Sequence, residues 1–285
     1  MGIKITKFNG DGNIGLYAYA TDKYCLIGKN IKEWQAKEIE QTLNVPVHRM
    51  TMCGTDLLGV FCAGTDETLI IPGISLNEER KILKELGINF EVIETKETAI
   101  GNNIAVNKNG AIINEDFSAN ERKKISQIFN VKVIRKNIGD VYVPGAIIAI
   151  NKKGGLISRY VSDEDKQMLE TLFNLKLKRG TLNMGSPFIK SGIIVNSHGM
   201  LVSANSGGPE IMNADEAYGF LYKIKEKSET PQKTKFKPKT KIKNTTTSKT
   251  KTKQKTKSKE KSKSKSKLLK ERKNGRERRT TKKIF

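Results

Sequence analysis

Apolar and polar positions follow a unit of about 44 residues that recurs through the first 222 residues of the chain. Each unit holds a short apolar segment, a tight turn, a second apolar segment and a stretch with helical spacing. The glycines that open the units are separated by 44, 42, 44 and 47 residues. They occur in Ile14-Gly15, Leu58-Gly59, Ile100-Gly101, Pro144-Gly145 and Ser191-Gly192. A fixed period of this length indicates a propeller or a solenoid.

The predicted helix starts keep the same period. In each, a side-chain oxygen able to cap the first turn precedes a carboxylate by three residues, which is the capping-box spacing or its near variant. The pairs are Asn30 with Glu33, Ser75 with Glu78, Ser118 with Glu121, and Ser162 with Asp165. A fifth, short helix is expected after Pro209. In the first helix, the spacing of Ile31, Trp34, Ile39 and Leu43 predicts that all four face the core.

The opening segments, such as 14–18 and 57–63, are predicted to be strands that lead into hairpins. The fifth unit has no closing strand of its own. Residues 3–8 alternate apolar and polar side chains and are predicted to supply that strand, so that the two ends of residues 1–222 meet. Closure removes the exposed sheet edges that favour aggregation. The expected fold is therefore α/β: a five-bladed β/α propeller with pseudo-fivefold symmetry, its helices outside.

The net charge of +23 is distributed unevenly along the chain. Residues 223–285 hold 27 Lys and Arg against 5 Glu, a net of +22, whereas residues 1–222 are almost neutral. We therefore predict two parts: a folded ring over 1–222 and a Lys/Ser/Thr-rich basic tail over 223–285 that is disordered in isolation. We expect the tail to act as an electrostatic tether to RNA, and the alternative is a solvated run of charge without a defined role. Tether candidates are Lys249, Lys251, Lys253, Lys255, Lys257, Arg272, Arg276, Arg278 and Arg279.

Three cysteines and two histidines show no metal-ligand spacing, so we expect no metal and no cofactor. This sparse cysteine content suits a reducing compartment. The longest apolar run, around 141–150, is too short to span a bilayer, and the first residues lack a signal peptide's apolar core. The sequence therefore predicts a cytoplasmic protein without a membrane partner.

Several motifs occur in order along the units and resemble a known family. They are Tyr24-Cys25-Leu26-Ile27, Ala99-Ile100-Gly101-Asn102-Asn103, Gly154-Gly155-Leu156, Gly180-Thr181-Leu182-Asn183-Met184-Gly185-Ser186, and the segment from Gly208-Pro209-Glu210 to Gly219-Phe220. Over about residues 1–222, this pattern resembles the archaeal and eukaryotic translation initiation factor six family, which has the pentein fold. The basic tail has no counterpart in the usual archaeal pattern.

The resemblance implies a monomer that binds the intersubunit face of the large ribosomal subunit and sterically blocks premature association with the small subunit. It implies a role in initiation and late large-subunit maturation, contact with a ribosomal protein near the sarcin–ricin loop, and removal by a release protein and a GTPase related to elongation factor two. No catalysis is implied. The alternative is a general RNA-binding protein acting through its basic tail.

The unit-opening turns hold equivalent places and are predicted to gather on one rim of the ring, where small residues let a partner approach. The resemblance and these turns give the candidate ribosome-binding residues Gly59, Val60, Gly101, Asn102, Asn103, Gly145, Ala146, Asn183 and Phe188. Simpler roles also fit: the glycines as turn formers, Asn102 as a turn residue, Phe188 as packing. Many relatives carry a basic residue where this chain has Val60, which weakens a charged contact there.

Some pentein relatives are enzymes that act on guanidino groups with a nucleophilic cysteine, a histidine and carboxylates. Such enzymes need a late cysteine in the axial cavity. This chain has no cysteine after Cys62, and His198 falls in a hairpin turn, where we expect it to be exposed. Buried packing is the expected role of Cys25, Cys53 and Cys62. We therefore predict that the protein is not an enzyme.

Overall fold

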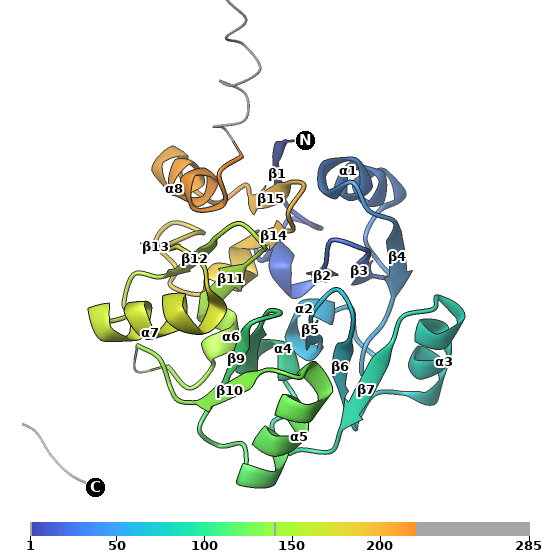
Figure 1. Ribbon diagram of the computed structural model, residues 1–285. Helices are drawn as coiled ribbons and strands as arrows, with labels where there is room; N and C mark the ends of the chain where they lie inside the picture. The colour runs from blue at the N-terminus through green and yellow to red at the C-terminus, as the bar shows by residue number, and fades with distance from the viewer. Residues whose placement is uncertain (1, 140, 221–285) are drawn as a thin grey trace, which may run out of the picture. The chain divides into compact units, whose positions relative to one another are not determined.

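The computed structural model describes residues 2–139 and 141–220, which form a ring of five similar units (Figure 1). Contacts divide the chain into two parts, Met1–Pro231 and Gln232–Phe285. The predicted basic tail and all of its tether candidates lie outside the described residues. Each unit has an opening helical turn, two antiparallel strands, one outer helix and a third strand.

The inner elements of the five units follow one another with the same order and similar lengths. The opening turns are η1 (Ile14–Leu16), α2 (Leu58–Phe61), α4 (Ile100–Asn103), α6 (Pro144–Ile147) and η2 (Ile189–Gly192). The first strands are β2 (Ala18–Ala20), β5 (Ala63–Gly64), β8 (Ile104–Val106), β11 (Ile148–Ile150) and β14 (Ile193–Val195). The second strands are β3 (Cys25–Gly28), β6 (Leu69–Pro72), β9 (Gly110–Ile113), β12 (Gly155–Ser158) and β15 (Met200–Ser203).

The outer elements complete each unit. The helices are α1 (Glu33–Leu43), α3 (Asn77–Glu85), α5 (Ala119–Phe129), α7 (Asp163–Phe173) and α8 (Gly208–Tyr218). The third strands are β4 (Val47–Met50), β7 (Phe90–Ile93), β10 (Lys132–Arg135), β13 (Leu177–Gly180) and, for the fifth unit, β1 (Ile3–Thr6). Each set of three strands forms a separate small sheet, in which the first pair is antiparallel and the second pair is parallel.

The predicted closure of the ring is confirmed. β1 pairs in parallel with β15, and the register places Ile3 opposite Met200 and Thr6 opposite Ser203. The backbone amide of Met200 also donates to the Gly2 carbonyl at 3.2 Å, and that of Ala204 donates to the Thr6 carbonyl at 2.8 Å. The first strand of the chain thus completes the last unit, and the α/β five-bladed architecture with helices outside is as expected (Figure 1).

The opening segments differ from the prediction, because they are single helical turns rather than strands. The amide of Cys62 donates to the Leu58 carbonyl at 2.9 Å, and in the next unit the amide of Asn103 donates to the Ala99 carbonyl at 3.1 Å. An apolar run of four residues cannot by itself distinguish a strand from a buried helical turn. In the structure, the first strand of each unit begins only after this turn.

Two of the four predicted helix caps are confirmed. Ser118 accepts from the amide of Glu121 at 3.2 Å, and Ser162 accepts from that of Asp165 at 3.0 Å. Asn30 and Ser75 do not cap their helices, because α1 begins after Lys32 and α3 after Leu76. The helix C-termini show another repeat: Asn44, Asn130 and Asn174 each adopt a left-handed conformation with φ of 51–52°. Asparagine tolerates this conformation better than most residues, so it ends the helix.

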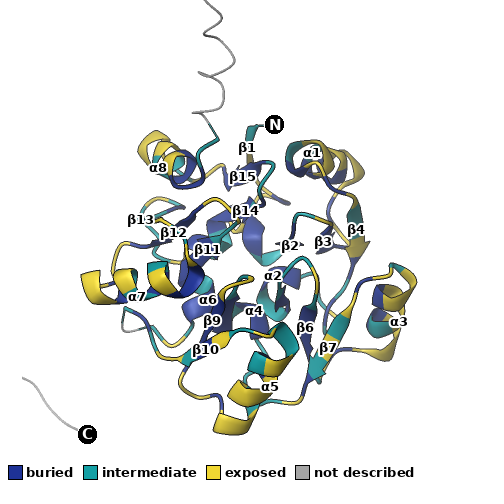
Figure 2. Ribbon diagram, viewed as in Figure 1, coloured by how far each residue is buried: buried dark blue, intermediate teal, exposed yellow. Residues whose placement is uncertain are grey.

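The core lies between the strands and the outer helices (Figure 2). Every residue of β3, β6, β9, β12 and β15 is buried, so these second strands are the centre of each unit. One core prediction is wrong: Trp34 is 59% exposed. The buried positions of α1 are Gln35, Ala36, Ile39 and Leu43, and Trp34 lies outside that stripe.

Candidate functional site

The five opening turns surround the axis of the ring at one of its ends. Each contacts the next: η1 with α2, α2 with α4, α4 with α6, α6 with η2, and η2 with η1. They surround a cavity of about 310 Å³. We call this cavity and its lining residues the rim: Asn13, Gly15, Leu16, Gly59, Asn102, Val143, Ala146, Ser186, Phe188, Lys190 and Ser191. The unit-opening turns thus gather at one place, as their equivalent positions in the sequence predicted.

Close backbone packing explains the opening glycines. A Cβ on Gly59 would overlap the Gly15 carbonyl oxygen, one on Gly101 would overlap that of Gly59, and one on Gly145 would overlap that of Gly101. All of these glycines are buried. Their lack of a side chain therefore lets neighbouring units approach each other around the axis. That these small residues also let a partner approach stays a prediction.

Some of the other predicted site residues line the rim and some do not. Asn102, Ala146 and Phe188 line the rim, and Phe188 is 43% exposed. Val60 is half-buried on the same opening turn as Gly59. Asn103 is buried, and its Oδ1 accepts from Asn114 Nδ2 at 3.1 Å, so it is not available to a partner. A binding role for the rim residues stays a prediction.

Asn183 belongs to a turn beside the rim that lies in an uncommon conformation. Asn183, Met184 and Gly185 all have positive φ, at 52°, 60° and 95°. Asn183 Nδ2 donates to Asn13 Oδ1 at 3.2 Å, which ties the turn to the rim. Met184 is 86% exposed. The turn therefore holds a large apolar side chain in solvent, although non-glycine residues adopt positive φ only at a cost.

A carboxylate of α8 stabilises this turn. Glu210 accepts from Thr181 Oγ1 at 2.7 Å and from the amides of Gly185, Gly207 and Met184 at 2.8, 2.9 and 3.2 Å. Burial acts to raise the pKa of Glu210, but these hydrogen bonds outweigh it, so the pKa lies below the ordinary value. The ionised carboxylate thus offsets the strain of the turn.

Lys190 is the functional-site residue that the sequence analysis missed. It is the sole charged side chain among the described residues that line the rim cavity. Its Nζ donates to the Gly101 carbonyl oxygen at 2.7 Å. Burial lowers the pKa of Lys190 to about 8, and the nearby Cys62 opposes that shift only in part. Lys190 lies 45 residues after Gly145, whereas Gly192 lies 47 residues after it, so Lys190 fits the repeat of about 44 residues better. This spacing is the sequence signal that could have identified Lys190.

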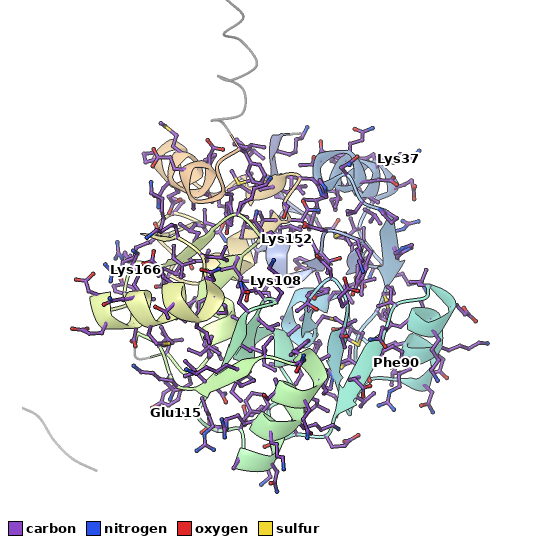
Figure 3. All side chains as sticks on the ribbon, in the orientation of Figure 1. Lys37, Phe90, Lys108, Glu115, Lys152 and Lys166 are labelled. Atoms are coloured by element: carbon purple, nitrogen blue, oxygen red, sulfur yellow. The ribbon has the colours of Figure 1, made fainter. Side chains whose placement is uncertain are left out.

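The hairpin turns surround the opposite end of the axis, where a cavity of about 660 Å³ lies. Lys152 Nζ pairs there with Asp66 Oδ2 at 2.6 Å and with Asp22 Oδ2 at 2.9 Å. Figure 3 shows Lys152 and Lys108 near the centre of the ring. Hydrogen bonds to Asp66 and Asp22 raise the pKa of Lys152 well above its usual range. Three units are thus joined by one ammonium group at this end.

The described residues show no arrangement typical of cysteine catalysis. Burial raises the pKa of the Cys25 thiol to about 12 and that of Cys53 to about 11, and it raises the pKa of Cys62 further still. Cys25 and Cys62 are buried, as predicted, but Cys53 is half-buried in a turn with φ of 54°. His198 is half-buried rather than exposed. Nothing within residues 2–139 and 141–220 groups three possible metal ligands, and no helix there is long and apolar enough to cross a membrane.

Five three-stranded units around an axis, with helices outside, define this chain as a pentein. The sequence pattern of the eIF-6 family matches residues 3–217, so the chain belongs to the eIF-6 family. It is 42% identical over 227 residues to translation initiation factor 6 of Pyrococcus furiosus, covering 78% of this chain and all of that protein. It is 41% identical to translation initiation factor 6 of Thermococcus gammatolerans, with 78% of this chain and 100% of that protein covered. It is 37% identical to translation initiation factor 6 of Saccharolobus solfataricus, with 74% of this chain and 96% of that protein covered. The resemblance inferred from the sequence is confirmed, and the relatives are translation initiation factors.

Among solved structures, the chain is similar to a dimethylarginine dimethylaminohydrolase from Pseudomonas aeruginosa. The identity is 12% and the TM-score 0.40, with 62% of this chain and 71% of that chain covered. This similarity is too low to indicate an activity.

Proposed function

We propose that the chain binds the intersubunit face of the large ribosomal subunit and sterically prevents premature association with the small subunit. It acts in translation initiation and in late maturation of the large subunit, in the cytoplasm and as a monomer. Membership of the eIF-6 family is the observation that carries this proposal. It is a binding function, and the protein is not an enzyme.

The structure supports this proposal through the rigidity of the ring. A steric block requires bulk and a surface that holds its shape when the partner binds. Because β1 closes the ring, each unit packs against a neighbour on both sides. The opening turns also pack backbone against backbone. Residues 1–222 are nearly neutral, whereas binding to an RNA backbone depends on clustered lysine and arginine. The neutral charge therefore favours a protein as the first contact, and the resemblance to the family implies a ribosomal protein near the sarcin–ricin loop.

The rim is the proposed contact surface. It presents the polar side chain of Asn102 beside the apolar side chains of Val143, Ala146 and Phe188. A patch with a partly exposed aromatic residue and few charges is typical of the centre of a protein–protein interface. A release protein and a GTPase related to elongation factor two complete the set of proposed partners, and the basic tail adds a contact with ribosomal RNA.

The test is light scattering of purified large and small ribosomal subunits as they join. The full chain is expected to inhibit joining in proportion to its binding to the large subunit. Asn102→Ala and Phe188→Ala are expected to weaken inhibition by about tenfold each, since each removes a central contact. Trp34→Ala is the matched control, because Trp34 is a large exposed side chain on α1, away from the rim. Equal inhibition by all three variants would contradict the assignment of the rim.

The alternative, a general RNA-binding protein that acts through its tail, is separated by truncation after residue 222. The truncated chain corresponds to the whole length of the Pyrococcus furiosus relative. We expect it to inhibit joining with lower affinity and with a weaker dependence on salt, because the lysines and arginines of the tail no longer release counterions. Loss of all specific binding on truncation would favour the alternative.

A further inference from the structure

Lys190 holds the position that a glycine holds in the other four units. The carbonyl that faces the Cβ position of Gly59 belongs to Gly15, and the carbonyl that faces Gly145 belongs to Gly101. Going round the ring, the carbonyl that faces Gly15 belongs to Lys190. Lys190 is therefore the fifth member of this set, and Gly192 is not. The spacings become 44, 42, 44 and 45 residues.

The Lys190 side chain extends across the axis of the ring. From η2 of the fifth unit, its ammonium group reaches the Gly101 carbonyl on α4 of the third unit at 2.7 Å. The neighbours of η2 round the ring are α6 and η1, so this hydrogen bond joins two units that are not adjacent. It is a brace across the axis, in addition to the contacts that run around it.

The surroundings of Lys190 do not favour a charge. It lines both the rim cavity and a second, axial cavity of about 120 Å³, whose other lining residues are all uncharged and, apart from the phenol of Tyr19, apolar. Among the described residues, Cys62 is the titratable group whose charge acts on the pKa of Lys190. An ammonium group in such surroundings costs folding free energy unless it is well paired, and an apolar side chain of similar length would fill the same space without that cost. Packing alone therefore does not explain a lysine here.

We propose that Lys190 is a positioning residue of the rim, whose ammonium group holds α4 through the Gly101 carbonyl and thereby fixes Asn102 in place. Asn102 follows Gly101 directly, and its amide donates to the Ala99 carbonyl at 2.9 Å within the same turn. A shift of α4 thus moves Asn102 within the cavity. The consequence for ribosome binding rests on the function proposed above, whereas the brace itself does not.

Amide hydrogen exchange tests the brace without a ribosome. In Lys190→Met, the amides of Asn102 and Asn103 are expected to exchange about tenfold faster, which corresponds to the loss of one hydrogen bond to a charged group. Lys108→Met is the matched control, because Lys108 is exposed at the opposite end of the axis. Exchange at Asn102 and Asn103 that stays the same in Lys190→Met would overturn the brace, whatever the chain does on ribosomes.

Cosedimentation with the large subunit tests the effect on the rim. Affinity is expected to fall about tenfold in Lys190→Met and to stay unchanged in Lys108→Met. If the unchanged chain does not bind the large subunit, the proposed function fails and the exchange result still decides the brace. If Lys190→Met exchanges faster and yet binds as the unchanged chain does, the positioning role is overturned.

Chemical rescue separates an ammonium group from simple filling of space. Lys190→Ala leaves a gap that opens into the rim cavity, beside the exposed Phe188. Propylammonium is expected to return the exchange rates of Asn102 and Asn103 toward those of the unchanged chain. Tetramethylammonium, which carries the charge but no N–H donor, is expected to have no effect. Rescue by both cations, or by neither, would contradict a role for the donated hydrogen bond.

Discussion

The fifth unit of the ring differs from the other four in three places. Its third strand, β1, comes from the start of the chain, whereas the other units use a strand that follows their own helix. Its opening turn carries Lys190 where the others carry glycine. Its outer turn, Asn183 to Gly185, has three successive residues with positive φ, whereas the corresponding turn in the second unit has two, Cys53 and Gly54.

The comparison shows how a repeated unit is adapted to close a ring. Four units can be identical in principle, because each is joined to the next by the chain. In the fifth unit, by contrast, β1 joins β15 without a covalent link between neighbouring elements, because the chain runs from β1 into the first unit. The fifth unit therefore depends on hydrogen bonds and side chains that the others do not need. Departures from the repeat therefore concentrate there, and each gives a way to test how much stability closure requires.

Deletion of residues 2–6 is expected to have the largest effect. It removes β1, leaves the edge of β15 unpaired and exposes the buried side chains that pack on it. We expect a loss of at least about 4 kcal/mol in the free energy of unfolding, since several backbone hydrogen bonds at about 1 kcal/mol each disappear together with apolar contacts. Urea denaturation of the deleted and the unchanged chain measures this loss in the free energy of unfolding. A synthetic peptide of residues 1–9 should restore part of the stability, and a scrambled peptide should not.

Gly59→Ala is expected to destabilise the ring by about 3 kcal/mol, because its Cβ would overlap the Gly15 carbonyl and force the units apart. Gly208→Ala is the control, since a Cβ there meets no atom within 4 Å. Thermal and urea unfolding of both variants measure the difference. A stable Gly59→Ala variant that only binds the large subunit less well would instead restore the partner-facing role first predicted for this glycine.

Glu210→Gln is expected to cost about 2 to 3 kcal/mol, because an ionised acceptor of four hydrogen bonds is replaced by a neutral one. Glu216→Gln, on the same helix but exposed, should cost less than about 0.5 kcal/mol. The folded-state pKa of Glu210 is lowered, so its contribution is present near neutral pH and is lost as the pH falls through that pKa. Unfolding measured from pH 7 to pH 3 should therefore show a steeper loss in the unchanged chain than in Glu210→Gln.

The pH dependence near Lys190 is the smallest expected effect. Its folded-state pKa of about 8 lies below the ordinary value of 10.5, so between these values the unfolded chain binds the proton and the folded chain does not. A shift of this size corresponds to at most about 3 kcal/mol. Because Lys190 is only half-buried and solvent screens its charge, we expect it to add about 1 to 2 kcal/mol of stability as the pH rises through this window. Buried thiols act in the opposite direction, so the measurement is the difference between the unchanged chain and Lys190→Met. A difference that stays constant from pH 7 to pH 10 would contradict a lowered pKa.

Prediction from sequence succeeded where a local pattern and the repeat agreed. Ser118 and Ser162 cap their helices, and residues 3–6 complete the last sheet. It failed where two structures fit the same pattern: the apolar opening segments are helical turns, and Trp34 faces solvent. Asn103 was placed on the rim although its side chain bonds to Asn114, a partner eleven residues away that no pattern of spacing identifies.

The sequence by itself determined the number of units, their order, the outer helices and the closing strand, because these depend on periodicity and on residues close together in the chain. Tertiary structure alone decided which residues meet at the axis. Five segments about 44 residues apart converge there, and a shift of two positions in one of them exchanges Gly192 for Lys190. Such a shift barely changes the period, yet it places an ammonium group at the axis, within hydrogen-bond distance of the Gly101 carbonyl.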